Sequence, residues 1–77
     1  MAKFWVTIRG VTMTSSAAAN VAETGTDVAA DLAALRAGTT TRRALLAECL
    51  DGADEDRIEG WREYVEALSL ALGEGVS

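Results

Sequence analysis

Histidine and proline are missing from this 77-residue sequence, and cysteine and lysine each occur once. Without histidine the chain lacks the usual general base of Ser-His-Asp and Cys-His catalysis and the commonest zinc ligand. A single cysteine allows neither an internal disulfide bond nor a CxxC pair, so a secreted disulfide scaffold is excluded. No GxGxxG or GxxxxGK[ST] motif marks a nucleotide site. These absences predict that the chain is not an enzyme and holds no metal or cofactor.

Long apolar runs are also missing. No window approaches the eighteen or so apolar residues that a membrane-spanning helix needs. The apolar stretch near the N-terminus is too short for a signal peptide, and Thr7 and Arg9 interrupt it. The sequence therefore predicts a cytoplasmic protein that does not contact membranes.

The apolar content of the chain is high, but much of it is alanine. Hydrophobic residues make up 49% of the sequence, and 15 of them are alanines that add little to a core. One small domain of this size rarely gains more than about 3–5 kcal/mol from its core without a staple or a partner. We therefore expect a single domain, residues 1–77, whose stability is marginal on its own.

The net charge of −5 is spread unevenly. Residues 1–22 carry two bases and no acid, whereas the rest of the chain carries twelve acids and five bases. Direct binding to nucleic acid needs clustered Lys and Arg, so none is predicted. An acidic half favours docking onto a basic protein surface, including that of a nucleic-acid-binding protein. The alternative is that the acids only keep the protein in solution.

Residues 3–9 alternate strictly between two kinds of side chain, which predicts a half-buried strand ending at Gly10. One face comprises Phe4, Val6 and Ile8, and the other comprises Lys3, Trp5, Thr7 and Arg9. A lone strand leaves backbone groups unpaired. It folds back through Arg9-Gly10 as a hairpin onto residues 11–14, pairs with its copy in a homodimer, or adds to another protein's sheet. A further alternative makes residues 1–12 an extension without a structural role.

Three short helices are predicted after this strand, each ended by a glycine. The first covers Asp27–Ala37, and the second runs from a threonine cap in residues 39–41 to Gly52. The third is capped by Asp54 and ends at Gly73. Its apolar side chains recur at heptad spacing: Ile58, Trp61, Val65, Leu68 and Leu72. Gly60 lies inside this helix, at a cost of about 1 kcal/mol relative to alanine. It is either tolerated there or allows a close backbone approach beside Trp61.

The predicted fold is thus a small, mainly α domain with one N-terminal β-strand followed by three helices (β-α-α-α). Residues 1–14 form the strand or extension, and residues 26–73 form the helical part. Residues 15–25 form a small, polar linker, with at most a weak helical turn over Ala17–Glu23 that Gly25 would end. Cys49 lies among leucines and is expected to be a small buried side chain. The carboxylates around Gly52 do not have the spacing of an EF-hand loop, and helix capping accounts for those of residues 54–56.

Eight acids between residues 48 and 66 and a few aromatic side chains are the candidate partner-binding residues. Trp5 is flanked by cations on its strand face, as is common for an exposed binding anchor, although burial under a helix is equally compatible. Tyr64 is expected at the rim of the third helix and Trp61 in the core. The candidate set is Trp5, Arg9, Glu48, Asp51, Asp54, Glu55, Asp56, Glu59, Glu63, Tyr64 and Glu66.

The segment from Leu35 to Leu46 (LRAGTTTRRALL) resembles the helix–Gly-x-Thr–helix junction of ribbon-helix-helix repressors and antitoxins. That family pairs strands from two chains and presents the polar strand face, here Trp5, Thr7 and Arg9, to DNA. In this sequence about 17 residues separate the strand from the first helix, and the helices are acidic. The pattern Arg57-x-x-x-Trp61-x-x-Tyr64 resembles a helix of phage tail-fibre assembly proteins.

The sequence as a whole favours a non-enzymatic, acidic module that binds a larger protein. Its hypothesised role is that of an inhibitor, of the antitoxin or anti-defence kind, that covers a basic, nucleic-acid-binding surface. The two resemblances supply the alternatives, which are a ribbon-helix-helix-like DNA-binding regulator and a structural or assembly component of a phage.

Overall fold

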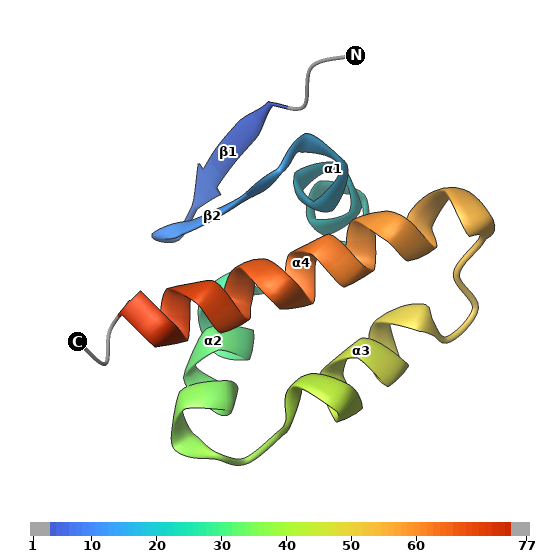
Figure 1. The fold of residues 1–77 in the computed structure, drawn as a ribbon. Helices are drawn as coiled ribbons and strands as arrows, with labels where there is room; N and C mark the ends of the chain where they lie inside the picture. The colour runs from blue at the N-terminus through green and yellow to red at the C-terminus, as the bar shows by residue number, and fades with distance from the viewer. Residues whose placement is uncertain (1–3, 75–77) are drawn as a thin grey trace.

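The computed structural model describes residues 4–74, which form a two-stranded antiparallel sheet and four helices (Figure 1). The elements are β1 (Trp5–Ile8), β2 (Val11–Thr14), α1 (Ser15–Thr24), α2 (Val28–Ala37), α3 (Arg42–Leu50) and α4 (Glu55–Glu74). The mainly helical class predicted from the sequence is confirmed. The count of one strand and three helices is wrong, because β2 and α1 are additional elements.

The N-terminal strand pairs along one edge with the next segment of its own chain. β1 pairs with β2 in a hairpin that sets Ile8 opposite Val11, and the two-residue turn is Arg9-Gly10. Both turn residues have positive φ, 53° and 82°, as a type I′ turn requires. Val11 and Met13 are fully buried, so the alternative that residues 1–12 have no structural role is wrong.

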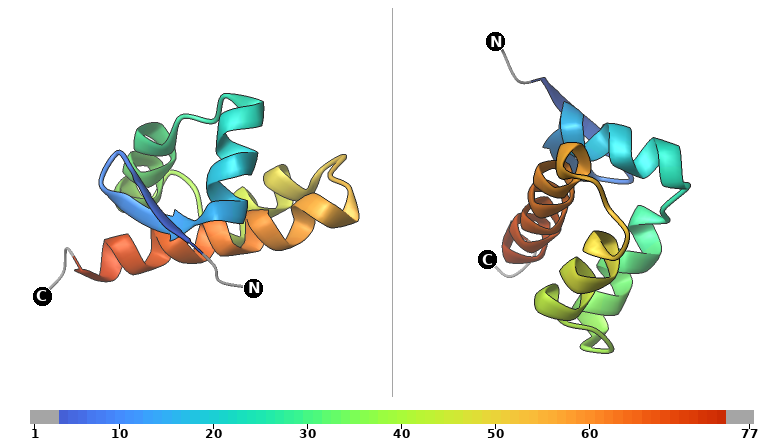
Figure 2. Two further views of the ribbon diagram at one scale, coloured as in Figure 1. Left: turned by 90° about the horizontal axis from the view of Figure 1, so that it is seen from above. Right: turned by 90° about the vertical axis from the view of Figure 1, so that its right-hand side faces the viewer.

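Residues 15–25, predicted to be a linker, are instead helix α1 with its cap. The Thr14 hydroxyl accepts a hydrogen bond from the backbone N–H of Ala17 (3.2 Å), which satisfies the start of the helix. Three consecutive alanines favour the helical conformation, and Gly25 ends it in the left-handed region at φ 67°. The segment lacks large apolar side chains because α1 lies close against α4 (Figure 2).

Gly60 makes that close approach possible. A Cβ atom at position 60 would overlap the amide of Asn20 and lie 3.0 Å from the carbonyl oxygen of Ser16. Asn20 is itself buried, and its Nδ2 donates to the carbonyl oxygen of Arg57 (2.9 Å). Of the two interpretations of Gly60, the structure therefore supports the close backbone approach, here between α1 and α4.

Helix α4 is the central element, and it contacts β2, α1, α2 and α3. The side chains of the predicted heptad stripe face inward: Trp61, Val65 and Leu68 are buried, and Ile58 and Leu72 are half-buried. Tyr64, expected at a rim, is fully buried and is therefore not available to a partner. None of the helices within residues 4–74 combines the length and the apolar character needed to cross a bilayer.

Candidate functional site

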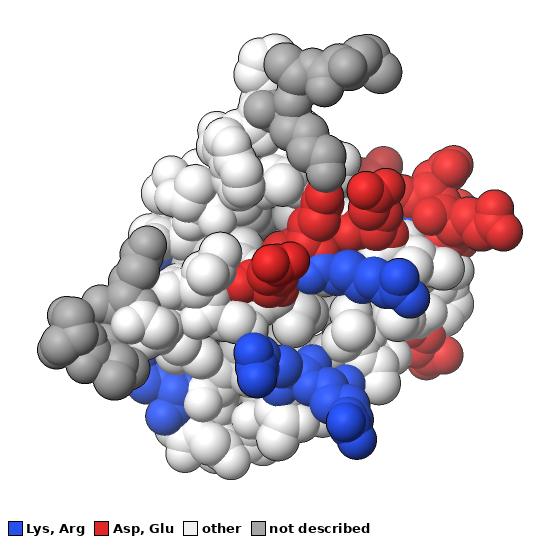
Figure 3. All heavy atoms as spheres, viewed as in Figure 1, with Lys and Arg blue, Asp and Glu red and all other residues white. Residues whose placement is uncertain are grey.

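The candidate acids fall into two separate groups. Asp56, Glu59, Glu63 and Glu66 recur every three or four residues and form one line on α4, which we call the α4 stripe. Figure 3 shows carboxylates gathered along α4, with basic side chains on the opposite flank. The remaining acids lie at the start of α4 and at the α3–α4 junction. Within the stripe, Glu63 accepts a hydrogen bond from the hydroxyl of Thr14 (2.6 Å) and so ties α4 to the hairpin.

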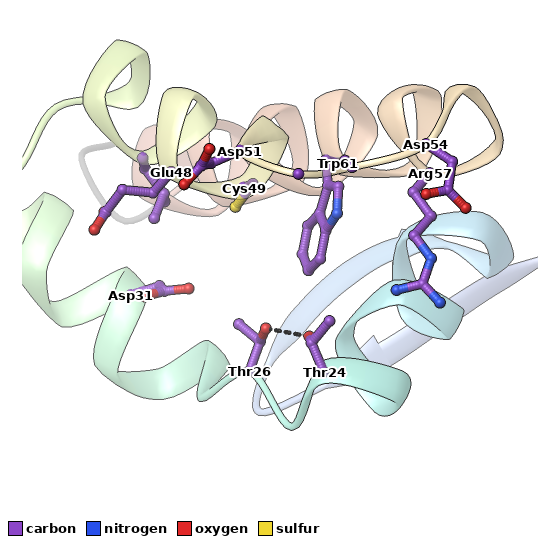
Figure 4. Close-up of a pocket in the computed structure, with 12 residues that line it drawn as sticks. Thr24, Thr26, Asp31, Glu48, Cys49, Asp51, Asp54, Arg57 and Trp61 are labelled. Carbon is purple, nitrogen blue, oxygen red and sulfur yellow. Dashed lines mark hydrogen bonds between the residues drawn. The ribbon is translucent and has the colours of Figure 1, made fainter.

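The second group lines a cavity of about 400 Å³, which we call the junction cavity (Figure 4). Its walls come from the end of α1, from α2, from α3 and from the start of α4. Four carboxylates line it: Asp31, Glu48, Asp51 and Asp54. At its floor the hydroxyls of Thr24 and Thr26 are 2.6 Å apart and hydrogen-bonded. The cavity is therefore strongly acidic and polar on several sides.

Trp61 supplies the one aromatic ring of this cavity. Trp61 is only 4% exposed. Its ring lies between Cys49 and Arg57 and extends toward the threonine pair (Figure 4). No hydrogen bond joins its indole N–H to any other described residue. Within residues 4–74 no side-chain nitrogen or oxygen that is buried from solvent lacks a partner, so this N–H is reached by solvent at the cavity wall, where it can donate to a ligand acceptor.

Arg57, the cation that lines the cavity, does not neutralise its four carboxylates. The guanidinium of Arg57 lies 2.8 Å from the carboxylate of Glu23, so its charge already has a partner. Tyr64 is not among the residues that line the cavity, but its hydroxyl donates a hydrogen bond to Asp31 Oδ2 (2.5 Å). This bond fixes the Asp31 carboxylate, which points into the cavity in Figure 4. Burial, followed by this hydrogen bond, raises the pKa of Tyr64 far above its ordinary value, so the phenol stays protonated.

Cys49 is a half-buried thiol at the same wall. Burial, followed by the charges of Asp31 and Glu48, raises the pKa of the Cys49 thiol to about 11. At neutral pH the thiol is protonated, and it does not have the electropositive surroundings of a nucleophilic cysteine.

We expect native Cys49 to react with iodoacetamide with a rate that rises around pH 11. A thiol with a pKa of 9.0 has roughly a hundredfold larger thiolate fraction at neutral pH than one with a pKa of 11. The rate of alkylation should be measured against pH in the native and the urea-unfolded chain. A native profile that follows the unfolded one, with its midpoint near pH 9, would contradict the acidic, buried surroundings of Cys49.

Trp5 and Arg9 lie elsewhere, on the hairpin. Trp5 is 67% exposed, so burial under a helix is not observed, and its role as a binding anchor stays a prediction. With Leu70, which is 60% exposed, it flanks a groove of about 220 Å³ whose rim carries Glu63 and Glu66. Glu55, also exposed, is in the first turn of α4. The structure thus separates the predicted site into hairpin, α4 stripe and junction cavity.

The junction cavity can hold an organic cation. Carboxylates accept hydrogen bonds from ammonium or guanidinium groups, and an indole face attracts a cation placed over it. Among residues 4–74 no group of three or more His, Cys, Asp or Glu side chains is placed to bind a metal ion. The chain matches no protein-family model, no curated protein and no solved structure.

Proposed function

We propose that this chain is a non-enzymatic binding module that takes a basic segment of a larger protein into the junction cavity. The observation that carries the proposal is the combination of four carboxylates with the unpaired indole N–H of Trp61. A carboxylate cluster alone is common on solvated surfaces. A solvent-accessible indole N–H on the wall of the same cavity adds a hydrogen-bond donor for a ligand carbonyl group.

An arginine or lysine residue of the partner can bind both the carboxylates and the Trp61 indole N–H. Its cation lies among Asp31, Glu48 and Asp51, where charge-assisted hydrogen bonds are stronger than neutral ones. The carbonyl group of the same peptide segment accepts from the Trp61 indole N–H. The α4 stripe is a field of like charge beside this site, and it increases the rate at which a basic surface associates.

The partner class that follows is a protein with an exposed basic surface, such as one that binds nucleic acid. A module that covers this surface competes with the phosphate backbone and acts as an inhibitor. The DNA-binding alternative is less well supported, because both acidic surfaces repel phosphate. The ribbon-helix-helix arrangement also differs, since a second strand, β2, and an additional helix, α1, lie between β1 and the helix pair joined at residues 38–41.

Two variants with equal changes in charge test this proposal. The junction variant carries Glu48→Gln, Asp51→Asn and Asp54→Asn, and the stripe variant carries Asp56→Asn, Glu59→Gln and Glu66→Gln. The partner is first captured from an extract of the native host and identified by mass spectrometry. Its affinity for the wild type and for each variant is then measured with purified proteins at several salt concentrations.

We expect the junction variant to lower affinity at least tenfold, mainly through faster dissociation, because charge pairs with three carboxylates, each exposed in the free chain, are lost. The stripe variant is expected to slow association by less than tenfold and to reduce its salt dependence. Equal losses in the two variants would show that only net charge matters. No loss in either would make the acids a solubility feature.

A further inference from the structure

The outer edge of β1 is open for pairing. Ile8 and Val11 flank the two-residue turn, so Ile8 and Val6 direct their backbone groups toward β2. The hydrogen bond from the Ser15 N–H to the Phe4 carbonyl oxygen (2.8 Å) fits the same alternation, since Phe4 also directs a backbone group toward the β2 side. The N–H and C=O groups of Trp5 and Thr7 consequently point away from β2. In the described part of the chain no other strand joins this sheet, and β1 lies on the side of β2 away from α4 (Figure 1).

Within residues 4–74 this edge lacks most of the features that usually prevent strand addition, although the strand is only four residues long. Proteins protect edge strands with proline, lysine, bulges or a covering segment. The sequence has no proline, the strand Trp5–Ile8 contains no charge, and its register with β2 runs without a bulge. Phe4 and Trp5 are 70% and 67% exposed beside it.

We propose that β1 pairs antiparallel with β1 of a second copy of this chain, with Thr7 at the two-fold axis. The product is a four-stranded sheet in the order β2-β1-β1-β2. This register sets Val6 opposite Ile8 of the second copy on the half-buried face. On the exposed face it sets Trp5 opposite Arg9 of the second copy, which forms a cation–aromatic pair.

Charge complementarity favours this occupant and this register. Trp5 lines the groove whose rim carries Glu63 and Glu66, so an incoming guanidinium meets an aromatic face and two carboxylates. The contact occurs twice because the interface is isologous. A register centred on Val6 would set Trp5 opposite Thr7 and lose both cation–aromatic pairs. The junction cavity lies on other elements, so this assembly goes beyond the proposed function and does not depend on it.

Self-crosslinking at the axis tests the proposal. In a Cys49→Ser background, Thr7→Cys places one thiol on each β1 strand at the two-fold axis. The Cα atoms of the two residues at position 7 are then about 5.5 Å apart, within the range of a disulfide. Thr12→Cys in the same background is the matched control. Thr12 is exposed and faces Thr7 across the hairpin, with the two hydroxyl oxygens 3.1 Å apart, but the two Thr12 residues are separated by both β1 strands in the proposed dimer.

We expect mild oxidation to convert most of the Thr7→Cys protein to a covalent dimer and to leave Thr12→Cys largely monomeric on non-reducing gels. The mass of the wild type in solution, measured by light scattering, should rise with concentration. Equal crosslinking of the two variants would overturn the register. A monomeric mass at every concentration together with no Thr7→Cys dimer would overturn the proposal.

Arg9→Asn provides a second measurement that keeps the hairpin intact. Asn-Gly is the preferred pair for a type I′ turn, so the monomer should be at least as stable to urea as the wild type. Loss of both cation–aromatic pairs should raise the Kd of the dimer about tenfold. An unchanged Kd would contradict the pairing of Trp5 with Arg9.

Discussion

Replacing Gly60 by valine is expected to destabilise the folded chain by about 3 kcal/mol. The new side chain would occupy the space of the Asn20 amide and press on the backbone of Ser16. Either α1 moves away from α4, or Asn20 turns and loses its hydrogen bond to the carbonyl of Arg57. Overpacking typically costs about 1–3 kcal/mol, and an unpaired buried polar group costs about as much again. The gain in helix propensity offsets only a few tenths of this.

Gly73→Val is the matched control, because Gly73 lies in the same helix and a Cβ atom added there would meet no other atom within 4 Å. We expect it to change the free energy of unfolding by less than about 0.5 kcal/mol. Urea unfolding followed by circular dichroism measures both variants. A total stability of about 3–5 kcal/mol leaves Gly60→Val close to unfolded without denaturant. Gly60→Ala provides a milder step in the same direction. Equal effects at positions 60 and 73 would contradict the close α1–α4 contact.

Removing the hydroxyl of Tyr64 is expected to have the second-largest effect on the free energy of unfolding. Tyr64→Phe deletes the hydrogen bond to Asp31 and leaves a half-buried carboxylate without that donor. Hydrogen bonds to charged groups contribute about 1.5–3 kcal/mol, so we expect a loss of about 2 kcal/mol at neutral pH. The phenylalanine ring keeps the apolar packing and the edge contact with Trp61, whose ring centroid lies 5.6 Å away. Urea unfolding measures this difference.

The same residue gives the fold a dependence on alkaline pH. The pKa of Tyr64 is raised in the folded chain, mainly by burial, above the ordinary value of 10.0. Above about pH 10 the unfolded chain therefore loses the phenolic proton while the folded chain keeps it, and stability falls as the pH rises. The thiol of Cys49 acts in the same direction from about pH 9, so the experiment uses a Cys49→Ser background.

Tyr64 is the only tyrosine, so tyrosinate absorbance reports it alone. We expect this absorbance to appear only together with the loss of helical circular dichroism. Tyr64→Phe in the same background should retain its stability across this pH range. Tyrosinate that forms near pH 10 in a chain that is still helical would show that Tyr64 is neither buried nor bonded to Asp31.

The helical core was predictable from the sequence because its signals are local. The heptad stripe of α4, the threonine cap at residue 41 and the glycine at residue 38 each act within a few residues. Helix α1 was missed because its buried residues are small, and only Gly60, forty residues away from Asn20, makes such a helix pack. The hairpin is one of four alternatives that the sequence leaves open, since arginine is a poor residue for the positive φ that the turn requires.

The candidate site was predictable only in part. Glu48, Asp51 and Asp54 are close in sequence and were found together, whereas Asp31 comes from α2 and joins them only in the folded chain. The heptad stripe predicts a rim position for Tyr64, because this residue flanks the stripe. Contacts of α4 with elements on several sides enclose that flank as well, which periodicity within one helix does not reveal.

The two indole N–H groups of the chain provide the most direct test of the junction cavity as a cation site. Trp61 lies in the cavity and Trp5 at the edge of β1, so the indole region of a ¹H–¹⁵N spectrum reports both separately. The probe is N-acetylarginine methylamide, which carries a guanidinium and two peptide carbonyls. The account predicts a saturable shift of the Trp61 indole resonance that the junction variant abolishes and the stripe variant keeps. An unmoved Trp61 resonance at about 20 mM probe, well above the millimolar Kd expected for one residue, would contradict it.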